Sequence, residues 1–378
     1  MHRSIVKSAL AGIVAVAAVS ATPATSKLPS EVSCGDTIVA DTILDRDLVD
    51  CPSNGIVIGA DNITLDLNGH TITGDGERFK GCGSREFCDT GVVNDGHDGI
   101  TLRDGSVRGF FAGVFVGKAR DNRVLRVSSS GNKYFGFVIA ESVRSVVRDS
   151  SGNNNPVPDG DGIGVFASRH LRIVNNSFRR NDLGMHVKDS TDIRIEGNRF
   201  ERNAHMGIVM EADRNEVRGN HCARNRDHCI AVGGSRNVIV GNRANRDNAG
   251  IAIDEGRSNV VARNVVLRAR RDGIRLGWVD PPIGGIATVI RSNVVRDSGR
   301  DAFVVSRYDR HSVLRGNLAI AAGDDGFDVN SPSAKLRNNR AIRNAELGIE
   351  AVHGVIDGGG NTARHNRDWR RCTNISCR

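Results

Sequence analysis

GDGIGVFASRHLRIVNNSFRRN (160–181) is followed without a break by DLGMHVKDSTDIRIEGNRFERN (182–203). AHMGIVMEADRNEVRGNHCARN (204–225) and RDHCIAVGGSRNVIVGNRANRD (226–247) continue the pattern. Each segment has a small residue, then an alternating apolar stretch, then an asparagine near its end. Self-similarity at this period is the sequence signature of a solenoid, in which each repeat packs against its neighbours.

Asparagines mark the register of the repeat. Five are spaced 22 residues apart, and four more continue the series after an insertion: Asn176, Asn198, Asn220, Asn242, Asn264, Asn293, Asn317, Asn339 and Asn361. A small residue ahead of each strand gives eleven readable rungs from Gly113 to Gly348. Asparagine accepts left-handed backbone angles at a bend, and stacked amides can satisfy the backbone groups of a turn. We therefore interpret the column as scaffold and not as a ligand set.

The composition of the rungs selects one solenoid class. They are rich in Gly, Asn, Val and Ile with an apolar spacing of two, which argues against helical repeats, and regularly spaced leucines are missing. We predict an all-β, right-handed parallel β-helix, because crossovers between parallel strands are right-handed. The side chains expected to point inward are Ile163, Val165, Met185, Val187, Ile208, Met210, Ile251, Ile253, Phe327 and Val329, with a second set of Ile173, Phe178, Ile195, Phe200, Val238 and Ile239.

The chain divides into four segments. Residues 1–24 carry Arg3 and Lys7 ahead of an apolar run, which is typical of a secretory signal peptide and predicts an extracellular or periplasmic protein. We expect an N-terminal cap with irregular coils over 25–109, the regular β-helix over 110–366 and a C-terminal cap over 367–378. We expect no membrane span, because no apolar stretch reaches the ~20 residues that a helix needs to cross a bilayer.

Eight cysteines, an even number, suit an oxidising compartment. They lie in close sequence neighbours, which suggests four local disulfides: Cys34–Cys51, Cys82–Cys88, Cys222–Cys229 and Cys372–Cys377. A structural metal site is the alternative, but the chain has no tight pair of CxxC motifs.

The formal net charge is +8 and comes mainly from arginine. A cationic surface attracts acidic polysaccharide, nucleic acid and anionic lipid alike. We do not expect nucleic acid as the partner, because the basic residues are spread through turns instead of clustering with stacking aromatics.

Carboxylates gather near the carboxyl end. Asp272, Asp301 and Asp325 take the same slot in three successive rungs, and Asp324 and Asp328 lie beside the last of them. Two carboxylates one rung apart would repel by ~3 kcal/mol at an effective dielectric constant of 20. Two explanations stay open: a Ca²⁺ site, or a surface network in which arginines offset the acids. The arginines in question are Arg271, Arg300 and Arg307.

The repeat, the asparagine turns and NITLDLNGHTITGDG (62–76) resemble the pectin-lyase-like superfamily over residues 34–377. That superfamily has the parallel β-helix fold and hosts lyases, hydrolases, epimerases and adhesins. GDDGFD (323–328), preceded one rung earlier by Asp301, resembles the calcium cluster of family-nine pectate lyases. The resemblance implies Asp301, Asp324, Asp325 and Asp328 as Ca²⁺ ligands, and cleavage of an acidic polysaccharide by β-elimination.

One residue departs from that family. Its catalytic base is a lysine on the following strand, whereas LGIEAV (347–352) places Glu350 in the comparable outward slot. Arg275 is the candidate for a substitute base or for a clamp on a substrate carboxylate. The residues expected to contact substrate are Asp272, Trp278, Arg307 and Tyr308, beside the insertion VDPPIGG (279–285).

A second polar group lies farther toward the amino end: His186, Lys188, His205, Glu211, His228 and Asp254. Glu211 and Asp254 share one outward column about two rungs apart, near the upper limit for an inverting glycosidase. A solvated charged face is the simpler interpretation.

We predict a secreted β-helix that engages, and cleaves by elimination, an acidic polysaccharide with Ca²⁺. The alternative is a non-catalytic carbohydrate-binding or structural surface protein, and glycoside hydrolase or epimerase activity ranks lower.

Overall fold

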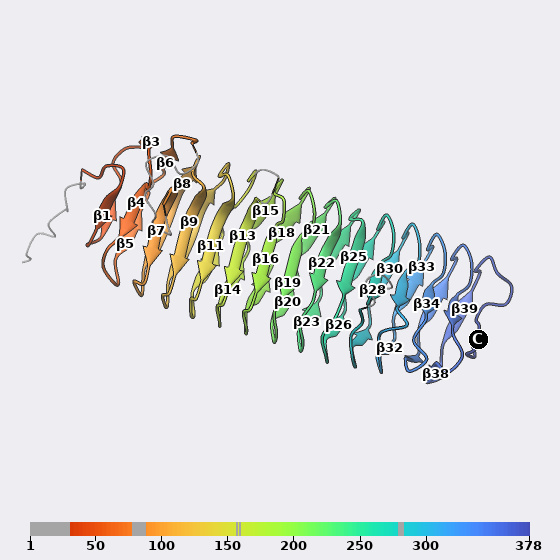
Figure 1. Ribbon diagram of the computed structural model, residues 1–378. Helices are drawn as coiled ribbons and strands as arrows, with labels where there is room; N and C mark the ends of the chain where they lie inside the picture. The colour runs from red at the N-terminus through yellow and green to blue at the C-terminus, as the bar shows by residue number, and fades with distance from the viewer. Residues whose placement is uncertain (1–30, 78–87, 156–157, 159, 279–282) are drawn as a thin grey trace, which may run out of the picture.

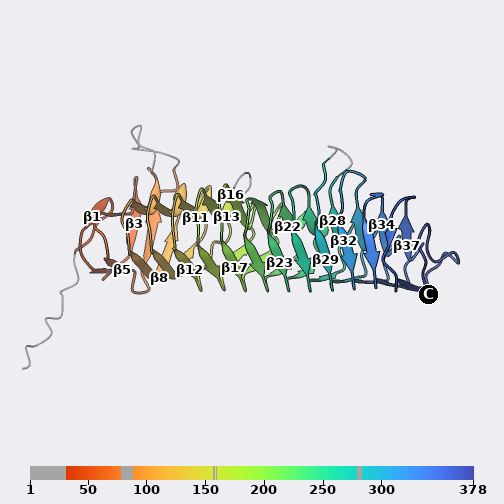
Figure 2. The same ribbon diagram turned by 90° about the horizontal axis from the view of Figure 1, so that it is seen from below.

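The computed structural model describes residues 31–77, 88–155, 158, 160–278 and 283–378. Within them the chain winds into one parallel β-solenoid that contains no α-helix. Figures 1 and 2 show an elongated coil in which the strands of successive rungs lie side by side from one end to the other. The predicted parallel β-helix is confirmed. No helix among the described residues is long and apolar enough to cross a membrane.

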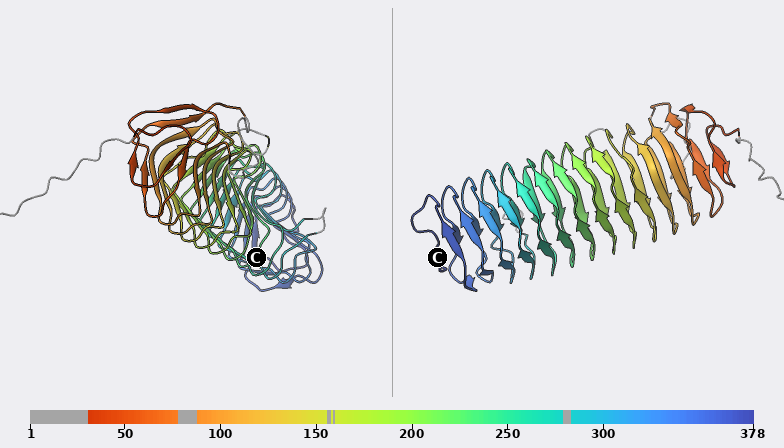
Figure 3. Two further views of the ribbon diagram at one scale, coloured as in Figure 1. Left: turned by 60° about the vertical axis from the view of Figure 1, so that its left-hand side comes forward. Right: turned by 180° about the vertical axis from the view of Figure 1, so that it is seen from behind.

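Three parallel sheets run along the solenoid, and Figure 3 shows their stacking from the end and from behind. Sheet A contains β1 (Asp36–Ile38), β4 (Ile56–Ile58), β7 (Thr90–Asp95), β9 (Ala112–Gly117), β11 (Phe135–Ala140), β13 (Asp161–Phe166), β16 (Met185–Lys188), β19 (Ile208–Glu211), β22 (His228–Val232), β25 (Ala249–Ile253), β28 (Ile274–Leu276), β31 (Phe303–Val305), β34 (Phe327–Val329) and β37 (Ile349–Ala351).

Sheet B contains β2 (Thr42–Ile43), β5 (Thr64–Asp66), β8 (Thr101–Arg108), β10 (Arg123–Ser129), β12 (Val146–Arg148), β14 (Arg172–Val174), β17 (Arg194–Glu196), β20 (Glu216–Arg218), β23 (Val238–Val240), β26 (Val260–Ala262), β29 (Val289–Arg291), β32 (Val313–Arg315), β35 (Lys335–Arg337) and β38 (Ile356–Asp357), with β3 (Leu48–Cys51) and β6 (Thr71–Gly74) joined at the amino end. Sheet C contains β15 (Ser177–Arg179), β18 (Arg199–Glu201), β21 (His221–Ala223), β24 (Arg243–Asn245), β27 (Val265–Leu267), β30 (Val294–Arg296), β33 (Leu318–Ile320), β36 (Arg340–Ile342) and β39 (Thr362–Arg364).

The period of the repeat sets the register. Ile163 pairs with Met185, and Met185 pairs with Ile208, so equivalent residues stack in columns. The inward residues predicted for sheet A are all buried. In the second predicted set one residue is wrong: Val238 is 37% exposed, whereas its neighbour Ile239 is buried. Successive strand residues point to opposite faces, so only one of the two can face the core.

The asparagine column is a buried hydrogen-bonded ladder. The Asn220 Nδ2 group donates to the Ile195 carbonyl oxygen at 2.9 Å and to the Asn242 Oδ1 atom at 3.0 Å. The Asn220 Oδ1 atom accepts hydrogen bonds from the backbone N–H and the Nδ2 group of Asn198, at 2.8 and 3.0 Å. Buried amides that are satisfied in this way stabilise the turn at each rung. The interpretation as scaffold is confirmed.

Three of the four expected disulfides are present: Cys34–Cys51, Cys222–Cys229 and Cys372–Cys377. Cys88 is disulfide-bonded, and the expectation for Cys82 lies outside the described residues, as does the predicted signal peptide. The Cys34–Cys51 bridge lies at the amino end of the solenoid, and the Cys372–Cys377 bridge lies at its carboxyl end.

Candidate functional site

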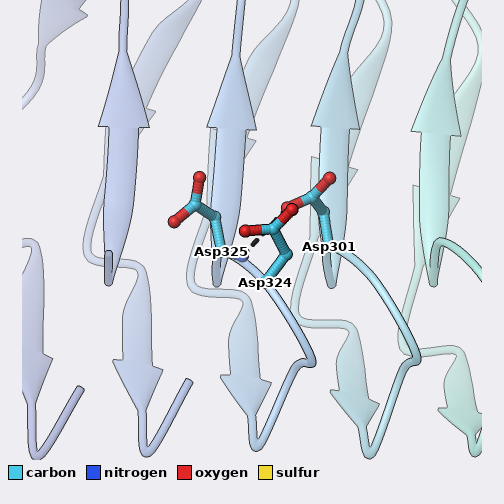
Figure 4. A group of neighbouring side chains, drawn as sticks. All are labelled: Asp301, Asp324 and Asp325. Carbon is cyan, nitrogen blue, oxygen red and sulfur yellow. Dashed lines mark hydrogen bonds between the residues drawn. The ribbon is translucent and has the colours of Figure 1, made fainter. Parts of the chain in front are cut away.

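Three aspartates converge where β31 and β34 begin. Asp301 precedes β31, and Asp324 and Asp325 precede β34 one rung later, so the sheet A register brings them side by side (Figure 4). One carboxylate oxygen from each lies within 4.8 Å of the others. The backbone N–H of Asp325 donates to the Asp301 Oδ1 atom at 2.9 Å, and the Leu347 N–H donates to the Asp325 Oδ1 atom at 2.7 Å. The predicted proximity of Asp301 and Asp325 is confirmed.

The acidic groups of the cluster lack a compensating cation among the described residues. Burial, together with the charges of Asp328 and Asp324, raises the pKa of Asp301 to about 7. Burial, a hydrogen bond with Glu350 and the Asp301 charge raise the pKa of Asp325 to about 8. Among the described residues none of the three clustered aspartates forms an ion pair with Arg or Lys. Hard carboxylate oxygens that lack a counter-charge suit Ca²⁺, which takes six to eight oxygen ligands.

Asp328 lies next to the cluster but outside its group of three. It pairs in register with Glu350 of β37, which occupies the outward slot expected from the sequence. Burial and the Glu350 charge raise the pKa of Asp328 to about 6, while a hydrogen bond from Asn330 lowers it. The carboxylates therefore extend from the cluster onto the outer face of sheet A.

A groove of about 440 Å³ opens beside these acids. Its walls include six of the residues predicted for the site: Asp272, Arg275, Trp278, Asp301, Arg307 and Asp328. Arg271 and Arg300 also line the groove, so it is cationic as well as acidic. Tyr308 does not line the groove; it is 39% exposed, and its ring centroid lies 5.9 Å from the Arg307 guanidinium carbon.

Arg275 is held more tightly than the sequence suggested. Only 6% of it is exposed, and its guanidinium carbon lies 3.2 Å from the centroid of the Trp278 ring. Its Nη2 group lies 3.1 Å from the His228 Nε2 atom and 3.4 Å from the Asp254 Oδ1 atom. Burial lowers the pKa of Arg275, and the Asp254 charge opposes that shift. One face of Trp278 is therefore covered by a cation and not available to a sugar.

The tautomer of His228 follows from this contact. A guanidinium can only donate, so the His228 Nε2 atom must accept and the proton must lie on Nδ1. The His228 Nδ1 atom lies 2.9 Å from the Asp227 Oδ1 atom, and the hydrogen bond from His228 is the main cause that lowers the Asp227 pKa. Asp227 thus contacts His228, and His228 contacts Arg275, which lines the groove. The sequence contained His228 as a candidate but no signal of its partner, which lies 47 residues away.

A second, larger groove of about 860 Å³ lies on sheet A toward the amino end. It contains Lys188, Glu211 and Asp254 of the second polar group. Lys188 lies 3.8 Å from Glu211, which supports the interpretation as a charged face. His205 lies elsewhere and pairs with Asp182 at 2.6 Å. Asp254 lines this groove and contacts Arg275 of the acidic one, so the two grooves adjoin.

The model of the right-handed beta helix region matches residues 54–210, 90–243 and 161–277, more than half of the chain. The chain belongs to this family. No curated protein matches it. Among solved structures it is similar to PfbA, a surface adhesin of Streptococcus pneumoniae, at 12% identity over 79% of this chain and 83% of that chain, with a TM-score of 0.53.

The chain is also similar to the solved structures of two enzymes. DFA-IIIase from Arthrobacter chlorophenolicus A6 shares 16% identity over 70% of this chain and 71% of that one, with a TM-score of 0.49. The A-module of the mannuronan C-5 epimerase AlgE6 from Azotobacter vinelandii shares 13% identity over 87% and 88%, with a TM-score of 0.48. At these identities a likeness shows at most the fold, and a fold alone does not decide function.

Proposed function

We propose that this β-helix protein binds an acidic polysaccharide on the outer face of sheet A, with Ca²⁺ held by Asp301, Asp324 and Asp325. The observation that carries the proposal is the convergence of three carboxylates within 4.8 Å, beside a groove and without a paired cation among the described residues. A carboxylate of the glycan would complete the oxygen shell of the ion.

Arginines favour an acidic glycan over a neutral one. Arg271, Arg300 and Arg307 line the groove next to the cluster, and none forms an ion pair with Asp301, Asp324 or Asp325 among the described residues. Guanidinium groups bind carboxylates in bidentate geometry. The carboxylates of uronates on either side of the Ca²⁺-bound sugar would therefore accept hydrogen bonds from these guanidinium groups. Because the acidic groove adjoins the larger one through Asp254, an extended chain suits the surface better than a monosaccharide.

Cleavage by β-elimination is the second candidate function. A base would take the C5 proton of a uronate, the electron pair would form the C4–C5 double bond, and the glycosidic oxygen would leave C4 and take up a proton. A bound cation would acidify the C5 proton by withdrawing electrons from the carboxylate. Arg275 favours this function because it lines the same groove as Asp301, where its guanidinium could hold the carboxylate of the uronate. Glu350, in place of the lysine of family-nine pectate lyases, favours binding without cleavage.

Calorimetric titration tests the binding proposal. Pectate and alginate oligomers are titrated into the protein with Ca²⁺ or with a chelator, using the wild type, Asp324→Asn and the matched variant Asp45→Asn, in an exposed bend at the amino end of the same solenoid. We expect Ca²⁺-dependent binding that Asp324→Asn abolishes and Asp45→Asn leaves intact. Binding that survives the chelator unchanged would contradict the role of the cluster. Ultraviolet absorbance of unsaturated uronate then separates cleavage from binding, and its loss in Arg275→Lys would show that cleavage requires the guanidinium.

A further inference from the structure

An arginine directly follows each of five successive strands of sheet C: β15, β18, β21, β24 and β27. The parallel register of these strands stacks the arginines in one column along the solenoid. At a rung spacing of ~4.8 Å the column is about 19 Å long. All five residues are exposed, and a cleft of about 240 Å³ lies beside the first two. We call this column the arginine ridge: Arg180, Arg202, Arg224, Arg246 and Arg268.

The backbone does not explain the choice of arginine at these positions. Each residue of the ridge has left-handed backbone angles, with φ between 52° and 64°. Such angles favour Gly, Asn and Asp over residues with long side chains. In four of the same five rungs the bend that follows the sheet B strand is also left-handed and carries the residues that sterics favour: Asn175, Gly197, Gly219 and Gly241. The ridge therefore carries a long cationic side chain where the fold itself would favour a small or polar one.

The positive charges of the ridge are not offset by acids. None of the five guanidinium groups forms an ion pair or a side-chain hydrogen bond among the residues that the structure describes. Glu201, beside the ridge, pairs with Arg179 and Arg199 instead. The Asp247 carboxylate is buried and accepts hydrogen bonds from two asparagines. Like charges on neighbouring rungs repel each other, so the column favours an anionic partner that neutralises them together.

The ridge ends where the acidic groove begins. Arg268 lies four residues before Asp272, which lines the groove. In the next rung Asp297 takes the ridge position after β30, and Asp301 of the acidic cluster follows it. A polymer that leaves the groove toward the amino end of the solenoid would therefore come close to a line of free guanidinium groups.

We propose that the arginine ridge is a second binding surface for the acidic polysaccharide, and for the class of ligand this rests on the proposed function. The ridge needs no Ca²⁺ and holds a stretch of the polymer that lies outside the groove. A polyuronate carries one carboxylate on each sugar, and its sugars repeat at a length close to the spacing of the rungs, so successive carboxylates meet successive arginines. Guanidinium groups bind carboxylates in bidentate geometry. Because the contacts act together, the affinity rises with the number of sugars on the ridge.

A nucleic acid fits the ridge less well than a polyuronate. Proteins hold single-stranded nucleic acids through aromatic side chains on which the bases stack, in addition to cations along the backbone. The residues directly before and after the ridge arginines are not aromatic. Phe178 and Phe200, two positions before the first two arginines, are buried in the core. The ridge thus offers charge without stacking surfaces.

Binding of polymeric pectate to the immobilised protein, in chelator and at low salt, tests the ridge. The wild type is compared with a ridge variant that combines Arg202→Gln, Arg224→Gln and Arg246→Gln. A control variant removes the same charge from dispersed exposed positions, through Arg46→Gln, Arg123→Gln and Arg315→Gln. We expect the ridge variant to bind the polymer roughly tenfold more weakly than the wild type, because several contacts are lost together, and the control variant to bind like the wild type. Wild-type binding should also weaken steeply between ~50 and ~200 mM salt.

Trigalacturonate separates the ridge from the groove. This trisaccharide covers only part of the ridge, so in Ca²⁺ it reports on the groove, and all three proteins should bind it equally. Absence of that binding would count against the function proposed for the groove, whereas the polymer measurement in chelator reports on the ridge. Equal weakening of polymer binding in both triple variants, or none in the ridge variant, would overturn the ridge. Tighter binding of an oligothymidylate than of pectate in chelator would overturn it in favour of a nucleic-acid surface.

Discussion

In the presence of a chelator the protein should become less stable as the pH rises from about 4 to about 8. The pKa values of Asp301 and Asp325 in the folded state are about 7 and about 8, against an ordinary value of 3.8. The folded state therefore holds protons that the unfolded state has released, and stability falls with pH across that window. For Asp301 a shift of about three pKa units corresponds to about 4 kcal/mol, or about 2 kcal/mol after solvent screening.

Added Ca²⁺ should reverse this loss, and more strongly at high pH, because the ion binds the ionised form. The assay is urea unfolding at pH values near 5 and 8, with chelator or with Ca²⁺. Asp324→Asn removes a charge that raises the Asp301 pKa and should flatten the pH dependence. Asp45→Asn, in an exposed bend, should behave like the wild type. Stability that stays constant or rises between the two pH values in chelator would refute the claim of uncompensated buried charge.

Three further results are expected. Asn220→Ala should lower the free energy of unfolding by roughly 3 kcal/mol in urea titrations, because it leaves buried donors and acceptors of the ladder unpaired. Cys222 and Cys229, both 0% exposed, should resist reduction and thiol labelling until the protein unfolds, as mass spectrometry would show. His228→Leu should weaken glycan binding through loss of the acceptor that orients Arg275, with a smaller effect in His228→Gln.

The columns of the solenoid could be predicted from the sequence. In parallel, in-register strands, residues that are one repeat apart in the sequence lie next to each other along the axis of the solenoid. The repeat placed Asp301 beside Asp325, which follows it by 24 residues, and Asp328 beside Glu350, which follows it by 22. The error at Val238 has a local cause. An apolar pair within a short strand does not reveal which member faces inward, and its position relative to the bend decides that.

The partners of long side chains could not be read from the repeat. Arg275 had several acids within reach in the expected columns, yet it contacts His228 two rungs away, Asp254 and the ring of Trp278. The long, flexible side chain of an arginine can reach more than one rung. Its interaction partners therefore depend on the shape of the surrounding surface. The same holds for Tyr308, whose side chain lies outside the groove that Trp278 lines.

The sequence by itself determined the period, the inward columns, the local disulfides among the described residues and the gathering of acids near the carboxyl end, because each depends on spacing along one chain. Only the tertiary structure decided which carboxylates lie together and that Arg275 is buried against Trp278. The physical reason is that distance, burial and unmet hydrogen bonds arise from all the rungs packed together. A repeat specifies where its strands lie, but the spaces between their side chains exist only in the folded solenoid.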